Sequence, residues 1–371
     1  MKTSFISILG AAILATAAFD AVAPVSAQQS GCTLTGQYTN SNAIANCNSI
    51  TIKDLVVPAG VTLNLTNLKA GATISIQGTT TFGSGKLWAG PLVLLSGENI
   101  KVNGAGTLDG QGLWYWKQDP SVTRPVFFRL HQANHAQLSG FTLKDSPFRT
   151  FSILNSQGPT LTGLTLDASS GDNVVNNKGV KVTAKNTDGF DLSQNTGVTI
   201  TNNHIHNQDD CLAMQSSTNT VFSGNTCVGG HGISVGSIGG AARDSTDTVS
   251  GLIVANNQIT NSANGIRIKT IIGEQCLVYN ATYTGNTLTN VDNAIVVHSD
   301  YDKSQGGYTG QATSAVGIQD ITINGLSGTA TNLYDINANP SAVSKWTFSG
   351  ITITAKNKAV NCKGAPSGIS C

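Results

Sequence analysis

Acidic and imidazole side chains recur at nearly constant intervals in the middle of the chain. Asp188 is followed 21 and 22 residues later by the adjacent pair Asp209 and Asp210, and His231 follows after a further 21 to 22 residues. If these steps bring the side chains together, the carboxylates repel one another and the pKa of at least one should rise. A carboxyl with a raised pKa can act as a general acid while an ionised neighbour acts as a base. Hydrolysis of a glycosidic bond requires this pair of roles.

Cations follow the carboxylates along the chain. Arg267 and Lys269 are two residues apart, and side chains two apart on a strand point to the same face. Asp300 and Tyr301 lie on the repeat after that. An arginine side chain offers a planar fork that matches a carboxylate, so the two cations predict binding of an anionic sugar. The alternative is a surface polar ladder in which one aspartate caps a turn.

A repeated six-residue pattern indicates how these side chains are positioned. Each copy alternates apolar and polar residues and then turns at Gly or Asn, which is typical of short β-strands. The clearest copies are Leu138–Leu143, Leu161–Leu166, Ile200–Ile205, Phe222–Cys227, Val254–Ile259 and Tyr283–Leu288. From Ile200 onward they start 22, 32 and 29 residues apart, as expected for one rung with loops inserted at a corner. One coil cannot bury its apolar face alone, so the pattern predicts an all-β, single-domain parallel β-helix of roughly ten coils. Leucine-rich repeats, the main rival, require a different Leu spacing.

The repeat places the acidic motifs on successive coils. Asp209 lies six residues after Asn203, and His231 lies six residues after Asn225, so the two occupy equivalent positions. Neighbouring strands are about 4.8 Å apart, which stacks these side chains into one patch. Asp210 directly follows Asp209 and would point to the opposite face of a regular strand. Both can face the patch only if the backbone bends between them, as at a strand end.

Composition excludes several classes of protein. Of the 371 residues only 11% are charged, the formal net charge is +1, and 39% are hydrophobic. There is no basic excess to neutralise phosphates, so we expect no nucleic-acid partner. The hydrophobic content argues against disorder. Low charge with 41 glycines favours a secreted all-β protein.

The first residues are typical of a secretory signal peptide. Lys2 supplies a positive charge, Phe5–Phe19 is an apolar stretch too short for a typical membrane span, and Val25-Ser26-Ala27 is a small-residue cleavage signal. We expect residues 1–27 to be removed and residues 28–371 to form the catalytic domain, with a short propeptide after Ala27 left open. The mature protein is predicted to be extracellular, with no membrane attachment.

Seven cysteines remain after export to an oxidising compartment, where disulfides form. Proximity in sequence predicts three pairs: Cys32–Cys47, Cys211–Cys227 and Cys362–Cys371. Cys276 is left over, and the scattered spacing argues against zinc. Asn64 and Asn280 head N-glycosylation sequons.

The four motifs Asn186-Thr187-Asp188, Asp209-Asp210-Cys211, Gly230-His231-Gly232 and Arg267-Ile268-Lys269 occur in this order. Together they resemble the signature of glycoside hydrolase family 28, the polygalacturonases, and most closely the fungal endo-polygalacturonases. The similarity extends from about Cys32 to Cys371. The resemblance implies a right-handed parallel β-helix that hydrolyses α-1,4 bonds in polygalacturonic acid (homogalacturonan, pectate) with inversion.

The resemblance also implies a role for each acidic residue. Asp209 corresponds to the general acid, and Asp188 and Asp210 to the pair that activates the water. His231 would hold the geometry and protonation of the cluster.

The remaining motif residues are expected to contact substrate. Arg267 and Lys269 would bind the galacturonate carboxylate, Tyr301 would pack on or hydrogen-bond the sugar, and Asn186 would orient the site. His298 departs from the fungal pattern, which often has Gln there, and is expected to affect a subsite or the pH profile.

Two other segments have less specific interpretations. Trp114, Tyr115 and Trp116 either line a distal sugar subsite or pack a loop onto the coils. Lys144, Asp145 and Arg149 are interpreted as an ordinary solvated turn.

Other functions on this scaffold stay open at this point. An exo-polygalacturonase or a rhamnogalacturonan hydrolase is the main alternative, although the compact length and the Gly-rich segment after His231 favour the endo type. A pectate lyase would need Ca²⁺ and a basic proton abstractor, and a non-catalytic solenoid would bind pectin without releasing reducing ends. We expect polygalacturonate as the partner, no cofactor, no metal and a monomer.

Overall fold

The computed structural model describes residues 32–119, 121–241 and 247–371. By internal contacts the chain forms two units, residues 1–30 and 31–371, and only the second is described below. The signal peptide expected at residues 1–27 lies outside the described residues. Within them, no helix is long and apolar enough to span a bilayer.

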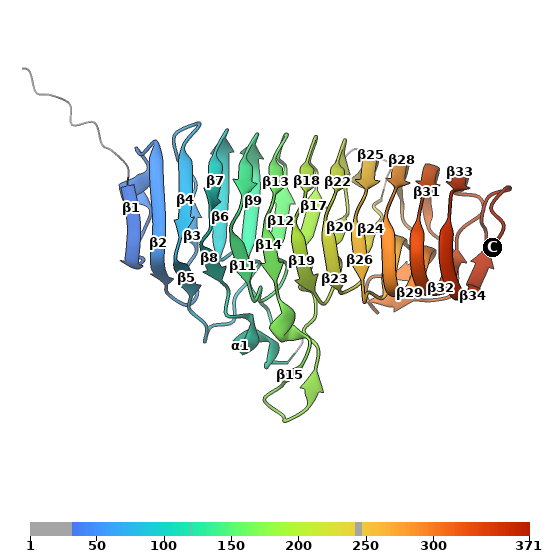
Figure 1. The fold of residues 1–371 in the computed structure, drawn as a ribbon, viewed down its shortest axis with the longest axis horizontal. Helices are drawn as coiled ribbons and strands as arrows, with labels where there is room; N and C mark the ends of the chain where they lie inside the picture. The colour runs from blue at the N-terminus through green and yellow to red at the C-terminus, as the bar shows by residue number, and fades with distance from the viewer. Residues whose placement is uncertain (1–31, 120, 242–246) are drawn as a thin grey trace, which may run out of the picture. The chain divides into compact units, whose positions relative to one another are not determined.

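Short strands stack coil upon coil along residues 32–371 as a right-handed parallel β-helix, which confirms the predicted fold (Figure 1). The first of its three parallel sheets comprises β1 (Cys32–Gln37), β2 (Ser49–Val57), β4 (Thr73–Gln77), β7 (Lys101–Gly104), β10 (Gln137–Ser139), β13 (Thr160–Thr162), β18 (Thr199–Thr201), β22 (Val221–Ser223), β25 (Thr248–Ala255), β28 (Gln275–Thr284), β31 (Ala315–Asn324) and β33 (Val343–Ser349). The second comprises β5 (Thr79–Phe82), β8 (Thr107–Asp109), β11 (Thr142–Lys144), β14 (Thr165–Asp167), β19 (His204–Asn207), β23 (Thr226–Gly229), β26 (Gln258–Thr260) and the first parts of β29 (Thr287–Asp302), β32 (Ser327–Asn337) and β34 (Thr352–Lys363).

We call the third sheet the cleft sheet because it carries the candidate site. It comprises β3 (Leu63–Leu65), β6 (Val93–Glu98), β9 (Phe128–Asn134), β12 (Phe151–Leu154), β17 (Phe190–Ser193), β20 (Leu212–Met214), β24 (Ile233–Ile238), β27 (Asn264–Ile271) and the later parts of β29, β32 and β34. The smaller elements are the turns Asn42–Ile44 and Ser169–Gly171, α1 (Gly112–Trp116), β15 (Val174–Val175), β16 (Lys181–Val182), β21 (Ser217–Thr218) and β30 (Gly307–Tyr308).

Stacked side chains fill the interior, one from each coil. Phe128, Phe151 and Phe190 hold equivalent positions on β9, β12 and β17. Their ring centroids are 5.4 and 5.2 Å apart, close to the spacing of the strands themselves. Each ring therefore buries the next, which a single coil could not do.

Buried asparagines form a ladder at one corner. The Nδ2 groups of Asn203, Asn225 and Asn257 each donate to the Oδ1 of the asparagine one coil further on, at 2.9, 3.1 and 2.9 Å, and Asn286 receives the last of these bonds. The same Oδ1 atoms also accept from backbone N–H groups at this corner. These bonds satisfy polar groups that the turns would otherwise leave buried and unpaired.

All three predicted disulfides are present: Cys32–Cys47, Cys211–Cys227 and Cys362–Cys371. The first and last lie at the two ends of the solenoid, whereas the middle one lies beside the acidic pair. Cys276 is buried.

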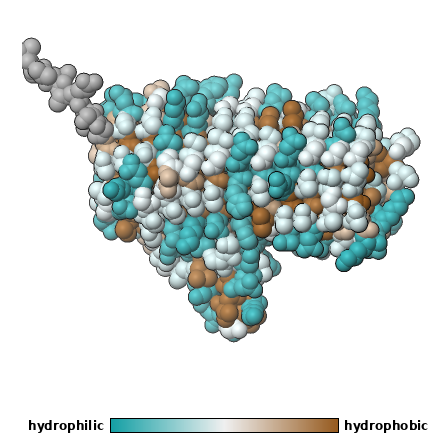
Figure 2. Space-filling model, viewed as in Figure 1, coloured by the Kyte–Doolittle hydropathy of each residue, from teal (hydrophilic) through white to brown (hydrophobic). Residues whose placement is uncertain are grey.

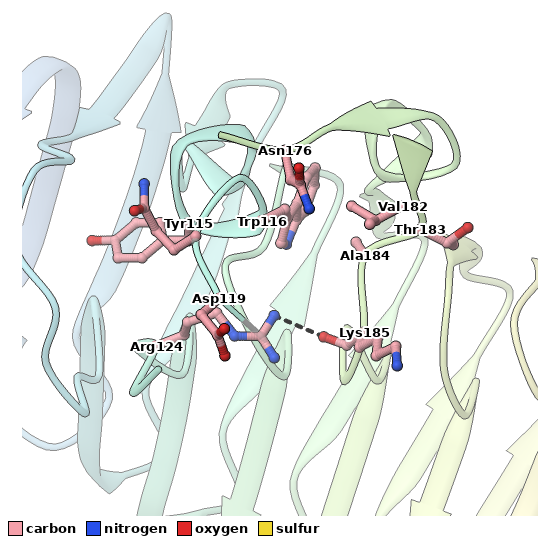
Figure 3. Close-up of a pocket in the computed structure, with 10 residues that line it drawn as sticks. Tyr115, Trp116, Asp119, Arg124, Asn176, Val182, Thr183, Ala184 and Lys185 are labelled. Carbon is pink, nitrogen blue, oxygen red and sulfur yellow. Dashed lines mark hydrogen bonds between the residues drawn. The ribbon is translucent and has the colours of Figure 1, made fainter. Parts of the chain in front are cut away.

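A projection formed by α1 and the hairpin β15–β16 extends from the body of the coils (Figure 1). Hydrophobic atoms appear on its surface in Figure 2, and Leu113, Val175 and Val180 are among the exposed large hydrophobic residues. The pocket beneath it measures about 110 Å³ and is lined in part by Trp116, Val182 and Ala184 (Figure 3). That volume is small for a ligand site.

The two aromatic residues at the base of this projection are buried. Tyr115 is 1% and Trp116 5% exposed, and Trp116 packs against Val174 and Ala184 beside the hairpin, so neither ring offers a sugar platform.

Candidate active site

One cleft on the cleft sheet brings together all eight residues that the sequence predicts to be catalytic or substrate-binding. Its volume is about 330 Å³. The predicted residues that line it are Asn186, Asp188, Asp209, Asp210, His231, Arg267, Lys269 and Tyr301. They come from consecutive coils, as the repeat predicts.

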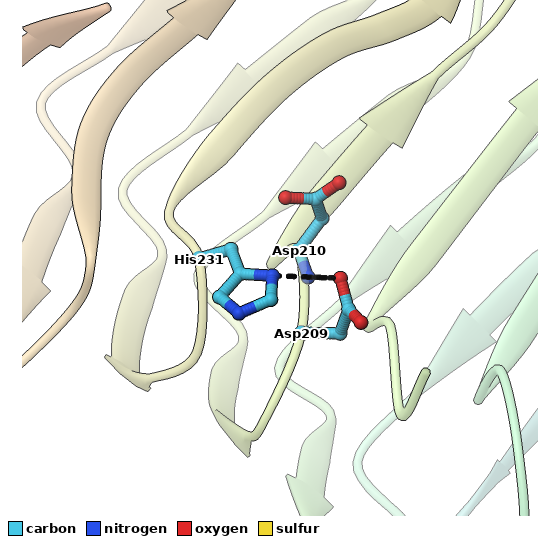
Figure 4. Close-up of side chains that lie close together, drawn as sticks. All are labelled: Asp209, Asp210 and His231. Atoms are coloured by element: carbon cyan, nitrogen blue, oxygen red, sulfur yellow. Dashed lines mark hydrogen bonds and ion pairs between the residues drawn. The ribbon is translucent and has the colours of Figure 1, made fainter. Parts of the chain in front are cut away.

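The bend between Asp209 and Asp210 occurs where the sequence requires it. Both lie between the end of β19 and the start of β20, at a corner rather than within a strand. Asp209 Oδ1 lies 3.0 Å from His231 Nδ1 and accepts a 2.9 Å hydrogen bond from the Asp210 backbone N–H (Figure 4). Burial would raise the pKa of Asp209, but the hydrogen bond and charge of His231 outweigh it and lower that pKa to about 2.

Asp210 is buried and fully engaged by donors. Ser234 Oγ donates to its Oδ1 at 2.7 Å, and Arg267 Nη2 binds the same oxygen. Lys269 Nζ donates to Oδ2 at 2.9 Å. Two cations and a hydroxyl therefore hold this carboxylate in place, and it is 1% exposed.

Asp188 has the opposite environment. It is 7% exposed, and its Oδ1 is buried with no hydrogen-bond partner among the described residues. Burial, followed by the charges of Asp191, Asp209 and Asp210, raises the pKa of Asp188 well above its usual range. The cleft thus contains a carboxyl with a raised pKa, Asp188, beside one with a lowered pKa, Asp209.

Two asparagines position the acidic corners. Asn186 donates its backbone N–H at 3.1 Å and its Nδ2 at 3.3 Å to Asp209 Oδ2. Asn207 donates its Nδ2 to the carbonyl oxygens of Thr187 and Asp210, at 3.0 and 2.9 Å. Asn207 therefore joins the two backbone segments that carry the aspartates.

The glycines on each side of His231 are required by close backbone approach. Gly230 has φ +65° and Gly232 has φ +81°. A Cβ at Gly230 would collide with the carbonyl oxygen of Asp209, and one at Gly232 would collide with that of Asn264. The Gly-His-Gly motif thus allows the coil to bring His231 against Asp209.

An aromatic group closes the C-terminal side of the cleft. Lys269 Nζ lies 5.6 Å from the centre of the Tyr301 ring, close enough for a cation–π contact. Tyr308 packs edge-on against Tyr301 with ring centroids 5.9 Å apart, and stacks on His298 at 3.8 Å. Tyr301 is thereby held in place from behind.

His298 is part of this support. Its side chain is 4% exposed, with Nδ1 2.7 Å from Asp300 Oδ1 and Nε2 3.1 Å from Asp335 Oδ1. Burial would lower the pKa of His298, but the two carboxylates outweigh it and raise that pKa. His298 is therefore an internal ion-pair residue and not a group that faces the sugar.

Sequence reasoning missed three charged residues that line the cleft, Arg149, Asp191 and Lys303. Arg149 Nε lies 3.1 Å from Asp191 Oδ2, so the interpretation of Arg149 as part of a solvated turn is wrong. Asp191 is on β17, three residues after Asp188, and its alternation with Phe190 and Leu192 gave a usable signal that it points outward.

Among the described residues, one group has metal-ligand geometry: Asp209, Asp210 and His231, whose ligand atoms lie within 4.8 Å of one another. The donor set does not suit a cation, because Arg267 and Lys269 already occupy the oxygens of Asp210 and a metal would lie beside their positive charges. We therefore assign no chemical step to a metal.

Known proteins are similar to this chain in sequence and in fold. The chain is 40% identical to a polygalacturonase of Cochliobolus carbonum, covering 97% of this chain and 98% of that protein. It is 41% identical to a probable endopolygalacturonase I of Aspergillus flavus, covering 98% and 99%.

Among solved structures, endopolygalacturonase I of Stereum purpureum complexed with two galacturonate matches with a TM-score of 0.65 at 26% identity, covering 89% of this chain and 98% of that one. An endo-xylogalacturonan hydrolase of Aspergillus tubingensis shares the fold, with a TM-score of 0.76 at 24% identity and coverage of 92% and 98%. The family described as glycosyl hydrolases family 28 matches residues 47–371, and the chain therefore belongs to this family.

Proposed function

We propose that the protein is an endo-polygalacturonase that hydrolyses α-1,4-galacturonosyl bonds in polygalacturonate by acid–base catalysis with inversion. The observation that carries this proposal is the arrangement around Asp210: two cations bind its oxygens in a cleft that also holds Asp188 and Asp209. Acid–base groups and cations for an anionic sugar thus occupy one site. The endo mode is supported by the Aspergillus flavus relative, named a probable endopolygalacturonase at 41% identity.

In this mechanism Asp209 donates a proton to the leaving oxygen, while Asp188 and Asp210 orient and deprotonate the attacking water. Inversion requires that the water attacks from the face opposite the leaving group. Asp210 suits the second role because Arg267 and Lys269 hold its carboxylate in a fixed orientation.

The pKa order of the protein's own groups is opposite to what the acid role of Asp209 needs, since the pKa of Asp188 is raised and that of Asp209 is lowered. Substrate supplies the correction. A galacturonate carboxylate at Lys269 adds negative charge beside Asp209 and displaces water, and both effects raise the pKa of a carboxyl. Neighbouring carboxyls titrate as a group. A proton that resides on Asp188 in the free enzyme can therefore reside on Asp209 when substrate is bound.

In the proposed complex, substrate binds to hydrogen-bond donors that make no contact within the protein. Lys269 has three N–H donors, of which one binds Asp210, so others can reach a galacturonate carboxylate. Tyr301 presents its ring beside this cation as a surface for the sugar. Asn186 and His231 hold Asp209 for proton transfer.

The sequence also supports proposals on localisation, oligomeric state and glycosylation. We propose that it is secreted after cleavage near Ala27 and acts as a monomer. Asn64 and Asn280 are exposed and thus accessible to glycosylation.

The test follows polygalacturonate digestion with and without EDTA, recording reducing ends, viscosity, unsaturated products and oligomer sizes. Early saturated oligomers of mixed length, no effect of EDTA and near-complete loss in Asp209→Asn are expected. Release of monomer or dimer alone would identify an exo-acting enzyme, and EDTA-sensitive unsaturated products a lyase. Cleavage of rhamnogalacturonan alone would assign the alternative hydrolase, and no cleavage of either polymer would reduce the cluster to a binding site.

A further inference from the structure

Four cations line the cleft, and Arg149 lies on the opposite side of the aspartates from Arg267, Lys269 and Lys303. Arg149 lies two residues before the start of β12, whereas Arg267 and Lys269 are on β27. Between β12 and β27 the cleft sheet contains β17, β20 and β24. The backbones of β12 and β27 are four strand spacings, about 19 Å, apart. The cationic heads reach inward from these two strands, Arg149 to Asp191 on β17 and Lys269 to Asp210 before β20, so they flank the carboxylates from opposite sides.

Contacts on two sides hold the Arg149 guanidinium in place. It lies over the ring of Phe148, 5.2 Å from the ring centre, and Arg124 lies at 5.2 Å from the same ring. Its Nε faces Asp191 Oδ2 at 3.1 Å. The Arg149 side chain is 37% exposed whereas that of Asp191 is 6% exposed, so one edge of the guanidinium is fixed and the rest is open to the cleft. Arginine has five N–H donors, and a single carboxylate does not use them all.

We propose that Arg149 binds the carboxylate of a galacturonate unit lying on the N-terminal side of the scissile bond, and so determines substrate choice at that subsite. The proposal rests on the proposed function, since it concerns the same polyanionic substrate. None of the four sequence motifs includes Arg149. With it, cations stand at both ends of the carboxylate cluster, as a substrate with one negative charge per sugar unit requires.

The partner of Arg149 supports a role beyond an internal ion pair. Burial raises the pKa of Asp191 to about 7, although Arg149 opposes that rise. Below this pH Asp191 carries little charge, so the positive charge of Arg149 is left for a ligand. Its bidentate fork also distinguishes a free carboxylate from a methyl ester, which offers no charge to it.

The experiment compares wild type with Arg149→Gln and Arg149→Lys on galacturonate oligomers of increasing length, on polygalacturonate and on partially methyl-esterified pectin. Arg129→Gln is the matched control, because Arg129 lies one strand earlier on β9 and is not among the residues that line the cleft. Circular dichroism and Tm establish that each variant is folded.

We expect Arg149→Gln to raise KM on polygalacturonate roughly tenfold, the scale of one charge-assisted hydrogen bond, with a change in kcat below threefold. The loss should shrink as the oligomer shortens, the favoured cleavage position should move, and the preference for unesterified over esterified substrate should fall at least threefold. Arg149→Lys should fall between the two, and Arg129→Gln should behave like wild type.

A folded Arg149→Gln enzyme with wild-type KM, cleavage positions and ester preference would overturn the proposal. A loss of kcat that is equal on every chain length would also overturn it, because that result assigns Arg149 to the support of Asp191. If the wild-type enzyme cuts polygalacturonate, either of these results overturns the role of Arg149 and leaves the proposed function intact.

Discussion

Asn207 donates a hydrogen bond of 2.9 Å to the carbonyl oxygen of Asp210 from the preceding end of β19. The same Nδ2 donates to Thr187, the residue before Asp188, at 3.0 Å. Asn207 is 2% exposed and makes no contact with substrate in the proposed mechanism, yet it fixes the distance between the two acidic corners. We therefore expect catalysis to depend on this buried amide.

Removing this amide tests its positioning role. Asn207→Ala loses two buried hydrogen bonds, which lowers the unfolding free energy by about 2–4 kcal/mol. Because the aspartates move relative to each other, kcat should fall roughly 10- to 100-fold while KM changes less than threefold. Steady-state kinetics and denaturant unfolding measure both. The control is His204→Ala, an exposed position on the same strand. A fall in stability with unchanged kcat would show that Asn207 is structural only.

The acid and base roles are separated by an oligogalacturonide with an activated aryl leaving group, which does not need protonation. Asp209→Asn should lower kcat on polygalacturonate at least 10³-fold relative to wild type. On the activated substrate the loss in kcat relative to wild type should be at least tenfold smaller. Asp188→Asn should lose activity equally on both, because water activation is still required. The reverse pattern, read from initial rates, would exchange the two assignments.

Asp191 makes stability depend on pH. Its pKa is raised to about 7 in the folded protein, above its ordinary value near 4. The folded state therefore binds more protons than the unfolded state between about pH 4 and pH 7, and stability falls as the pH rises through this window. Asp191→Asn should flatten the decline and raise Tm at pH 7 by about 2 °C or more relative to the change at pH 4. Thermal unfolding at both values checks it, and parallel Tm–pH curves for the two proteins would contradict it.

His298 gives a dependence in a higher window. Burial acts to lower its pKa, but Asp335 and Asp300 outweigh burial, so the folded pKa lies above the unfolded value near 6.5. Stability from this group is complete below that value and is lost as the pH rises through the folded pKa. His298→Gln should be less stable than wild type at pH 5.5, with a difference that narrows towards pH 9. A constant difference across this range would exclude the ionic contribution.

The coil architecture was predictable because its physical requirement is local. Each rung must alternate apolar and polar residues, and the recurring asparagines satisfy buried turns, as the bonds between Asn203, Asn225 and Asn257 show. Equal offsets from these asparagines also placed Asp209 and His231 correctly side by side.

Contacts across coils were less accessible from sequence. Arg149 precedes its strand in a segment that resembles a polar turn, and only the register of β12 with β17 brings it to Asp191. His298 shares a strand with Tyr301, but the packing of Tyr308 and Asp335 decides that it points into the protein. These side-chain orientations depend on residues far away in the sequence, and the repeated pattern carries no information about them.

Coil length and strand register are independent in this solenoid. The coil from Phe222 to Val254 is ten residues longer than the coil from Ile200 to Phe222. The strands nevertheless stay in register, because Thr226 pairs with Gln258 and Gln258 pairs with Thr287. The added length falls between β24 and β25, beyond Ser237 of the cleft. A coil of this solenoid can therefore gain residues at its corner after β24 while β20, β24 and β27, the strands that position Asp209, His231 and Arg267, keep their register.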